Sequence, residues 1–177
     1  MNLFGSDASG LVRVKDVVAE AGLTERYFYE SFRDLGALFE AVFNLVMQDI
    51  ETEVNAAVQK VPEDGLTRIS TALRTSVDKL AGDPRMIQII FVGALGKGGR
   101  AGSRRSEALW RTAKSFLGWS GAHGSPFDDS PKARMKALAL SGAASELLIS
   151  WAEGLLEITP DELADFLVGL YRRMNLP

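Results

Sequence analysis

Residues 14–32, VKDVVAEAGLTERYFYESF, decide the fold because they hold two helical patterns separated by a glycine. In the first pattern, apolar side chains recur at positions i, i+3, i+4 and i+7 from Val14, which is one face of a short helix. Gly22 ends that helix, and Thr24 is a favourable N-cap for a second helix through about Phe32. The segment therefore predicts two short helices joined by a tight turn.

The rest of the chain also carries helical patterns. Sustained alternation of β-branched residues is absent from the sequence, whereas Ala, Leu, Glu and Arg are frequent. Two segments carry signals for the start of a helix. Asp83 precedes Pro84, and Thr159 to Glu162 is a capping box with Pro160 at the first helical position. Helices are predicted at about 35–60, 64–81, 83–95, 103–119, 131–154 and 159–174. The sequence therefore predicts an all-α protein.

The composition indicates a folded protein and excludes several kinds of chemistry. Hydrophobic residues make up 46% of the 177-residue chain and charged residues 24%, as in one compact domain or a small module of a larger protein. The sequence has no cysteine and a single histidine, His123, which excludes disulfides, a cysteine nucleophile and a thiolate or histidine-rich metal site. No spacing of carboxylates and histidine suggests catalysis, so we expect neither enzyme activity nor a cofactor.

Neither a membrane span nor a secretory signal is visible in the sequence. The longest apolar stretches, such as 86–95, are too short to cross a bilayer, and residues 1–10 lack the basic and apolar regions of a signal peptide. We therefore expect a soluble cytoplasmic protein. The net charge of −3 does not by itself favour a nucleic acid as partner, so DNA binding must rest on a local feature.

The two short helices have the sequence form of a helix-turn-helix. In that arrangement the second helix places its N-terminal side chains in the major groove of DNA. Thr24 then offers a hydroxyl to a phosphate, Arg26 two donors to guanine, and Tyr27 a contact with a thymine methyl or a phosphate. Phe28 and Phe32 lie four residues apart and anchor the helix to its neighbours. The alternative is ordinary packing, because such helix pairs are common in all-α proteins that never contact DNA.

Residues 12–43, VRVKDVVAEAGLTERYFYESFRDLGALFEAVF, resemble the DNA-binding segment of TetR-family transcriptional regulators. The runs Ala-Glu-Ala-Gly-Leu-Thr at 19–24 and Tyr-Glu-Ser-Phe at 29–32 have the spacing of that family's turn and recognition helix. Further along, Asp-Pro-Arg at 83–85, the small-residue helix at 131–154 and the Thr-Pro-Asp-Glu-Leu start of the last helix match the family's helix plan more weakly.

The resemblance implies a ligand-responsive regulator, a repressor, that binds a palindromic double-stranded DNA operator as a homodimer. Residues 1–47 would form the helix-turn-helix DNA-binding head, and residues 48–177 the ligand-binding and dimerisation domain. A small-molecule effector of unknown identity, bound in the second domain, would change the spacing of the two heads and release the operator. The DNA contacts are then assigned to Arg13, Lys15, Thr24, Glu25, Arg26, Tyr27, Tyr29 and Arg33.

Three features depart from the family's pattern. The family's first helix is truncated here, since only residues 2–4 can represent its end. Leu35 stands where the family usually has a lysine that meets a phosphate, and residues 1–47 hold more acidic than basic side chains. The alternative function is therefore a dimeric small-molecule-binding helical module whose DNA binding is impaired or lost.

An apolar ligand cavity is predicted around the helix at 85–95, which is apolar on nearly all sides. Ordinary core packing explains each candidate lining residue equally well. These candidates are Met86, Ile90, Phe91, Trp110 and Phe116. Basic side chains predominate between Lys97 and Lys114, where the alternatives are a solvated face and an anion-binding site.

The helix at 131–154 is rich in small residues, which allow helices to approach closely. Together with the helix at 159–174 it predicts a two-fold dimer interface. The alternative is that the apolar residues of the last helix face the core of their own subunit. The residues assigned to the interface are Ala139, Gly142, Ala143, Leu163, Phe166, Leu167 and Leu170.

Overall fold

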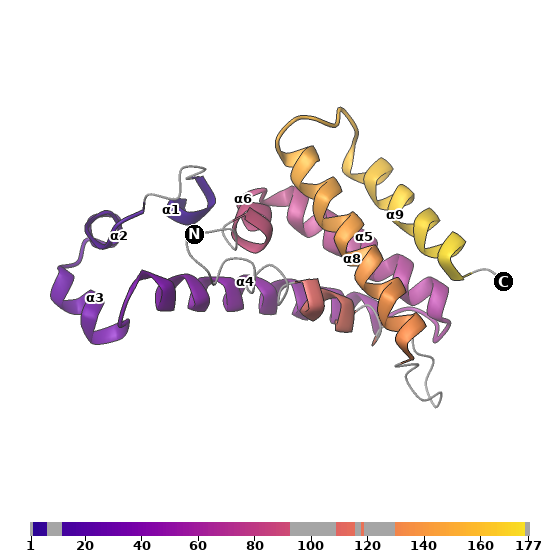
Figure 1. Ribbon diagram of the computed structural model, residues 1–177, viewed down its shortest axis with the longest axis horizontal. Coiled ribbons are helices and arrows are strands. Elements are labelled where there is room, and N and C mark those ends of the chain that lie inside the picture. The colour runs from indigo at the N-terminus through magenta and orange to yellow at the C-terminus, as the bar shows by residue number, and fades with distance from the viewer. Residues whose placement is uncertain (1, 7–11, 93–108, 116–117, 119–129, 176–177) are drawn as a thin grey trace.

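A computed structural model describes residues 2–6, 12–92, 109–115, 118 and 130–175. Within these ranges the chain forms helices and no strand (Figure 1), which confirms the all-α prediction. Residues 109–115 are also helical. The helices with defined bounds are α1 (Asn2–Ser6), α2 (Val14–Ala21), α3 (Glu25–Ser31), α4 (Leu35–Val58), α5 (Gly65–Gly82), α6 (Arg85–Ile87), η1 (Gln88–Val92), α8 (Pro131–Ala152) and α9 (Pro160–Asn175).

The turn between α2 and α3 follows from the glycine that the sequence singled out. Gly22 has φ 65°, in the left-handed region that glycine adopts without a steric penalty. The next residue closes the turn, because the Leu23 N–H donates to the Val18 carbonyl at 2.8 Å. Thr24 occupies the N-cap position of α3 as predicted, but its exposed side chain makes no capping hydrogen bond. Thr24 therefore lies at the predicted N-cap position, but its hydroxyl does not cap the helix.

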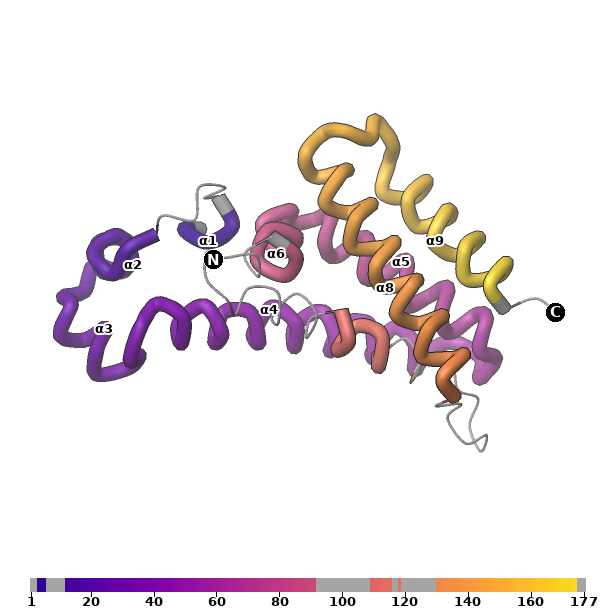
Figure 2. The backbone as a smooth tube through the Cα atoms, in the orientation of Figure 1, coloured from indigo at the N-terminus to yellow at the C-terminus, as the bar shows by residue number. Residues whose placement is uncertain are grey.

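Helix α4 connects the two ends of the molecule. It begins after Asp34, whose side chain accepts a hydrogen bond from the Ala37 N–H at 2.8 Å. Figure 2 shows α4 running from the end that holds α3 to the end that holds α5. Its buried residues recur along one face and are Phe39, Val46, Met47, Ile50, Val54 and Val58.

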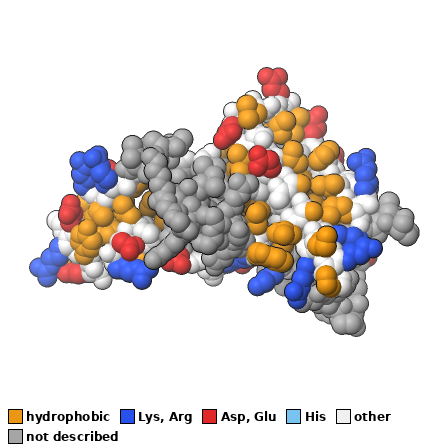
Figure 3. Space-filling model, viewed as in Figure 1, with side chains coloured by type: hydrophobic (Ala, Val, Ile, Leu, Met, Phe, Trp, Pro, Cys, Tyr) orange, Lys and Arg blue, Asp and Glu red, His pale blue; other side chains and the backbone are white. Residues whose placement is uncertain are grey.

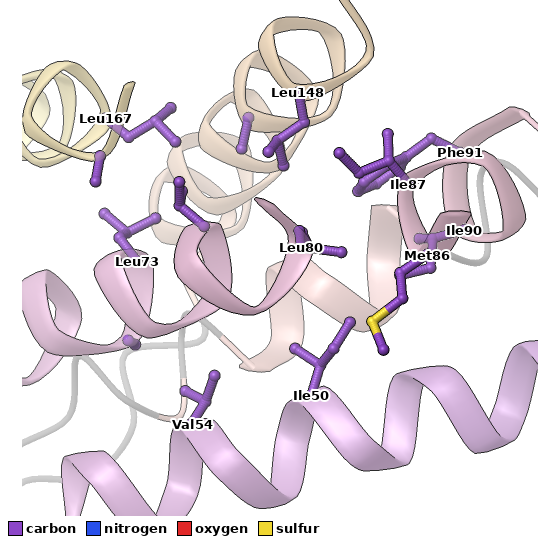
Figure 4. Close-up of a cluster of buried hydrophobic side chains, with 14 of the residues drawn as sticks. Ile50, Val54, Leu73, Leu80, Met86, Ile87, Ile90, Phe91, Leu148 and Leu167 are labelled. Carbon is purple, nitrogen blue, oxygen red and sulfur yellow. The ribbon is translucent and has the colours of Figure 1, made fainter. Parts of the chain in front are cut away.

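The main core lies where α4, α5, α8, α9 and η1 meet. Helix α5 packs against both α4 and α9, and its buried Ile69, Leu73 and Val77 follow the helical period. Side chains from several helices converge there (Figure 4), among them Ile50 of α4 and Leu148 of α8. Burial of this apolar surface is the main stabilising term of the fold.

The segment after Asp83 differs from the single α-helix predicted at 83–95. Pro84 takes the N-cap position, the Asp83 side chain accepts from the Arg85 N–H at 3.2 Å, and only residues 85–87 are α-helical. The chain then continues as the π-helix η1, whose wider turns accompany burial of Ile89 and its neighbours on all sides. The predicted end at residue 95 lies outside the described residues.

Helix α1 contacts α6 and η1, so the start of the chain lies beside the middle of the molecule (Figure 1). The approach is close, because a Cβ at Gly5 would lie 2.5 Å from the Cβ of Arg85. On its other side, the ring of Phe4 meets Phe39 of α4 edge to face, with ring centroids 5.4 Å apart. Helix α1 thereby joins α4 to α6.

Helix α9 begins with the capping box that the sequence predicted. The Thr159 N–H donates to the Glu162 carboxylate at 2.8 Å, and the Glu162 N–H donates back to the Thr159 hydroxyl at 3.2 Å. The Thr159 hydroxyl also donates to that carboxylate at 2.9 Å. Of the helices in the described ranges, none has the length and apolar character needed to span a bilayer.

The capping box makes part of the stability depend on pH. The Thr159 N–H, and then its hydroxyl, hold the pKa of Glu162 below its ordinary value of 4.5. Because the folded pKa is depressed, this stabilisation is fully present above pH 4.5 and is lost as the pH falls through the folded pKa. We expect the difference in unfolding free energy between the wild type and Glu162→Gln to shrink below pH 4.5. Urea denaturation between pH 3 and pH 7 measures it, and a difference that stays constant across that range contradicts the prediction.

Candidate DNA-binding surface and ligand cavity

Helices α2 and α3 lie at one end of the molecule, away from α5, α8 and α9 (Figure 1). Within α3, Phe28 is the buried side chain, with 4% of its surface exposed. Its ring packs against Phe32 at a centroid distance of 5.9 Å, and Phe32 is half-buried. The two residues predicted as anchors are therefore in contact with each other, and Phe28 is buried.

The other aromatic side chains of α3 face outward. Tyr27 is 56% exposed and Tyr29 is 58% exposed, and Leu23 in the preceding turn is 53% exposed. Large apolar side chains that gather on a surface mark interaction sites more often than single ones do. Figure 3 shows hydrophobic side chains at this end of the molecule, with basic and acidic side chains around them. We call the exposed surface of α2, the turn and α3 the α3 surface, and define it by residues 13–33.

Every residue predicted to contact DNA is exposed and belongs to the α3 surface. Its three arginines each have an acidic neighbour: Arg13 with Asp16 at 3.3 Å, Arg26 with Glu30 at 2.9 Å, and Arg33 with Asp34 at 3.4 Å. These pairs were not predicted, although the i,i+4 spacing of Arg26 and Glu30 would have indicated theirs. Exposed pairs of this kind contribute about 0–1 kcal/mol, so a phosphate or a base can replace the carboxylate at little cost.

Arg13 and Asp16 also form the start of α2. The Arg13 N–H donates to the Asp16 carboxylate at 2.9 Å, and the guanidinium donates to the same oxygen at 3.3 Å. The backbone hydrogen bond is the main reason that the pKa of Asp16 lies below its ordinary value. Arg13 is therefore fixed at the helix N-terminus, with 66% of its side chain exposed.

A cavity of about 60 Å³ lies within the core, between α4, α5, η1, α8, α9 and the helical residues 109–115. Apolar side chains make up most of its wall, as in most small-molecule sites. Its described lining residues are Met47, Ile50, Glu51, Leu73, Ser76, Val77, Leu80, Ile90, Phe91, Thr112, Ser115, Ser141, Ala144, Leu148 and Leu167.

The predicted cavity residues are only partly correct. Ile90 and Phe91 line the cavity. Met86 is buried but points towards α4 near Ile50 (Figure 4), and it is not part of the wall. Trp110 is 40% exposed and does not line the cavity, because the side of its helix that does so carries Thr112 and Ser115. Phe116 lies outside the described residues.

Polar groups in the cavity wall are few. Glu51 at its edge accepts two hydrogen bonds from Arg111, at 3.0 and 3.3 Å, and Arg111 also donates to Asn44 at 3.0 Å. In the interior, the hydroxyl of Ser141 is buried without a hydrogen-bond partner among the described residues, and so is that of Ser145 one turn along α8. Ser141 could not be selected from the sequence, because its role depends on the residues that surround it.

A second hollow, of about 300 Å³, lies between α1, α2 and α4. The prediction from sequence did not include it. Its wall is mainly apolar, and Glu20 at its edge is exposed. The lining residues are Leu3, Phe4, Val17, Glu20, Ala21, Leu38 and Val42.

The residues assigned to the dimer interface divide between the core and the surface. Leu163 and Leu167 are 1% and 0% exposed within one subunit, so their assignment to an interface was wrong. They lie on the side of α9 that joins the main core, where α9 packs on α5. Phe166, between them in the sequence, is 54% exposed. Ala139 is exposed as well, whereas Gly142, Ala143 and Leu170 are half-buried.

The basic segment at 97–114 can be described only at its end, at Arg111 and Lys114. Arg111 donates hydrogen bonds to Glu51 and Asn44, and Lys114 is exposed.

Among the described residues, no cluster of acidic or histidine side chains could hold a metal ion. No protein-family model matches the sequence, and no curated protein matches it either.

Proposed function

We propose that the chain is a ligand-responsive DNA-binding transcriptional regulator, a repressor that acts as a homodimer on a palindromic operator. The observation that carries this proposal is the division of α3 into two faces. Phe28 is buried against the fold, while Arg26, Tyr27 and Tyr29 extend into solvent from the same short helix. A helix that only supported the core would not need exposed aromatic and guanidinium groups, whereas a helix in the major groove uses both.

The position of α4 supports a link between DNA and ligand. This helix follows α3 after Asp34 and contributes Met47, Ile50 and Glu51 to the cavity wall. A displacement of α4 at the cavity would be transmitted along a continuous helix to α3, because an uninterrupted helix behaves as a rigid element. A ligand that fits one position of α4 better than another therefore changes the affinity for DNA.

A face of α8 and α9 supports the homodimer. Phe166 and Ala139 are exposed on these helices, and Figure 3 shows hydrophobic side chains gathered on this part of the molecule. Two copies related by a two-fold axis would cover that face and place two α3 surfaces on one DNA duplex.

The second candidate function is a small-molecule-binding helical module without DNA binding. The ion pairs of the α3 surface favour it, because Asp16, Glu30 and Asp34 compensate the three arginines. Affinity for DNA rises with the number of phosphates that a protein neutralises, and these carboxylates oppose it.

Repeated selection from a pool of random DNA duplexes separates the two functions. The regulator is expected to enrich a palindromic sequence, and fluorescence anisotropy should then measure tighter binding to it than to a scrambled duplex. The affinity for the enriched duplex should fall as salt is added, with a slope set by the phosphates contacted. If no sequence is enriched and both duplexes bind alike, the second function is correct.

A further inference from the structure

We propose that the cavity binds a small, uncharged and mainly apolar molecule with one hydroxyl or carbonyl group, which pairs with Ser141. This inference rests on the proposed function for the ligand's regulatory role, since it names the chemical class of the effector. Three observations carry it: the apolar wall, the neutralised charge at the edge and the unpaired hydroxyl inside.

The described part of the wall disfavours a charged ligand. Of the described residues that line the cavity, only Glu51 is charged, and its carboxylate already accepts two hydrogen bonds from Arg111. A carboxylate or ammonium group placed among Ile50, Leu73 and Leu148 would lose its hydration without gaining a partner. The ligand is therefore uncharged and makes contact mainly through carbon atoms.

Ser141 supplies the polar contact. Serine hydroxyls within helices usually donate to the carbonyl four residues earlier, as Ser70 does to Leu66 at 2.7 Å and Ser115 does to Arg111 at 3.2 Å. The Ser141 hydroxyl has no partner among the described residues, although Ser141 is 1% exposed and lines the cavity. A hydroxyl can donate or accept, so a ligand hydroxyl or carbonyl satisfies it.

Ser145 provides an internal comparison. It lies one turn further along α8, is 0% exposed and also has an unpaired hydroxyl, but it does not line the cavity. The two serines share residue type, helix and burial, and differ in access to the cavity. Of these two serines, only Ser141 should affect a ligand contact.

The volume limits the size of the ligand. About 60 Å³ exceeds the 10–15 Å³ that one water molecule requires and is less than the roughly 150 Å³ of a cavity that holds benzene. A ligand with two or three carbon atoms, smaller than benzene, fits this range. Ethanol and propane are suitable probes, because they have equal length and differ only by a hydroxyl in place of a methyl group.

Methyl NMR titration of the full chain, without DNA, tests the inference. Both probes should shift the methyl signals of Ile90 and Leu148 saturably, whereas acetate should not. In Ser141→Ala the affinity for ethanol should fall about fivefold to tenfold, as expected for one lost hydrogen bond. The affinity for propane should be unchanged in this variant, and Ser145→Ala should change neither affinity.

Four outcomes overturn the inference: no saturable binding of either probe, tighter binding of acetate, an equal loss of affinity for both probes in Ser141→Ala, or the same effect in Ser145→Ala. Ser141→Cys is a second variant that keeps a hydrogen-bonding group but with a weaker donor, and its affinity for ethanol should lie between those of wild type and alanine. Because DNA is absent, binding of ethanol through Ser141 stands even if the selection experiment finds no operator. Conversely, an operator can be found while the cavity remains closed to these probes.

Discussion

Replacing Leu163 with alanine is expected to lower the free energy of unfolding by about 2–5 kcal/mol, the usual cost of removing a leucine from a packed core. Leu163 is 1% exposed and belongs to the main core, and it does not line the cavity, so its truncation leaves a new void. Urea denaturation followed by circular dichroism measures this loss.

Phe166→Ala is the matched control on the same helix. Phe166 is 54% exposed, so its loss should change the unfolding free energy of the isolated subunit by less than about 0.5 kcal/mol. If α9 forms the proposed dimer interface, Phe166→Ala should instead weaken self-association, measured by sedimentation at several protein concentrations. A stability loss in Leu163→Ala that appeared only at concentrations where the wild type is dimeric would mean that Leu163 lies at the interface after all.

The helix boundaries were predictable because they depend on local chemistry. Gly22 ends α2 through its left-handed conformation, and the capping box at Thr159 starts α9 with two reciprocal hydrogen bonds. Each signal involves residues within about four positions of one another, so the sequence contains all of the information. Phe28 was also predictable as an inward-facing residue, since its spacing of four from Phe32 places both rings on one face of the helix.

The inward faces of the core helices were not predictable in the same way. Helix α9 carries Leu163, Phe166 and Leu167 within two turns, and which of them is buried depends on how α9 lies against α5. The same reason explains the errors at the cavity. Trp110 was the candidate because it is large and apolar, but its helix turns Thr112 and Ser115 towards the cavity instead.

The π-helix and the unpaired serines depend on tertiary structure still more strongly. The sequence at 83–95 has the caps and apolar content of an ordinary α-helix, and η1 forms where Ile89, Ile90 and Phe91 enter the core. Ser141 resembles any small residue of a close-packed helix. It becomes a candidate ligand contact only because its hydroxyl lies at an apolar cavity without a partner.

Arg26→Ala is expected to weaken binding to the selected operator by about 2–6 kcal/mol, or roughly 30-fold to more than 10⁴-fold. The estimate assumes that each subunit of the dimer loses one bidentate contact with a base, at about 1–3 kcal/mol each. The fold should be retained, because the Arg26 side chain is 84% exposed and its pair with Glu30 stabilises an isolated helix by only about 0.2–0.5 kcal/mol. Fluorescence anisotropy with the enriched duplex measures the effect, and Arg134→Ala, an exposed arginine of α8, is the control that should change nothing.

Glu30→Gln tests the same contact from the opposite direction. At present the Glu30 carboxylate accepts from Arg26 at 2.9 Å and also repels phosphates. Its neutralisation should therefore raise operator affinity severalfold, with the larger gain at low salt, where screening of the removed charge is weakest. In the Arg26→Ala background, Glu30→Gln should raise operator affinity less than in the wild type. Only the loss of repulsion between Glu30 and the phosphates then contributes, because the Arg26 guanidinium that Glu30 holds is already absent. An equal gain in both backgrounds would mean that Arg26 does not reach the DNA, and that the exposed tyrosines of α3 serve a different partner.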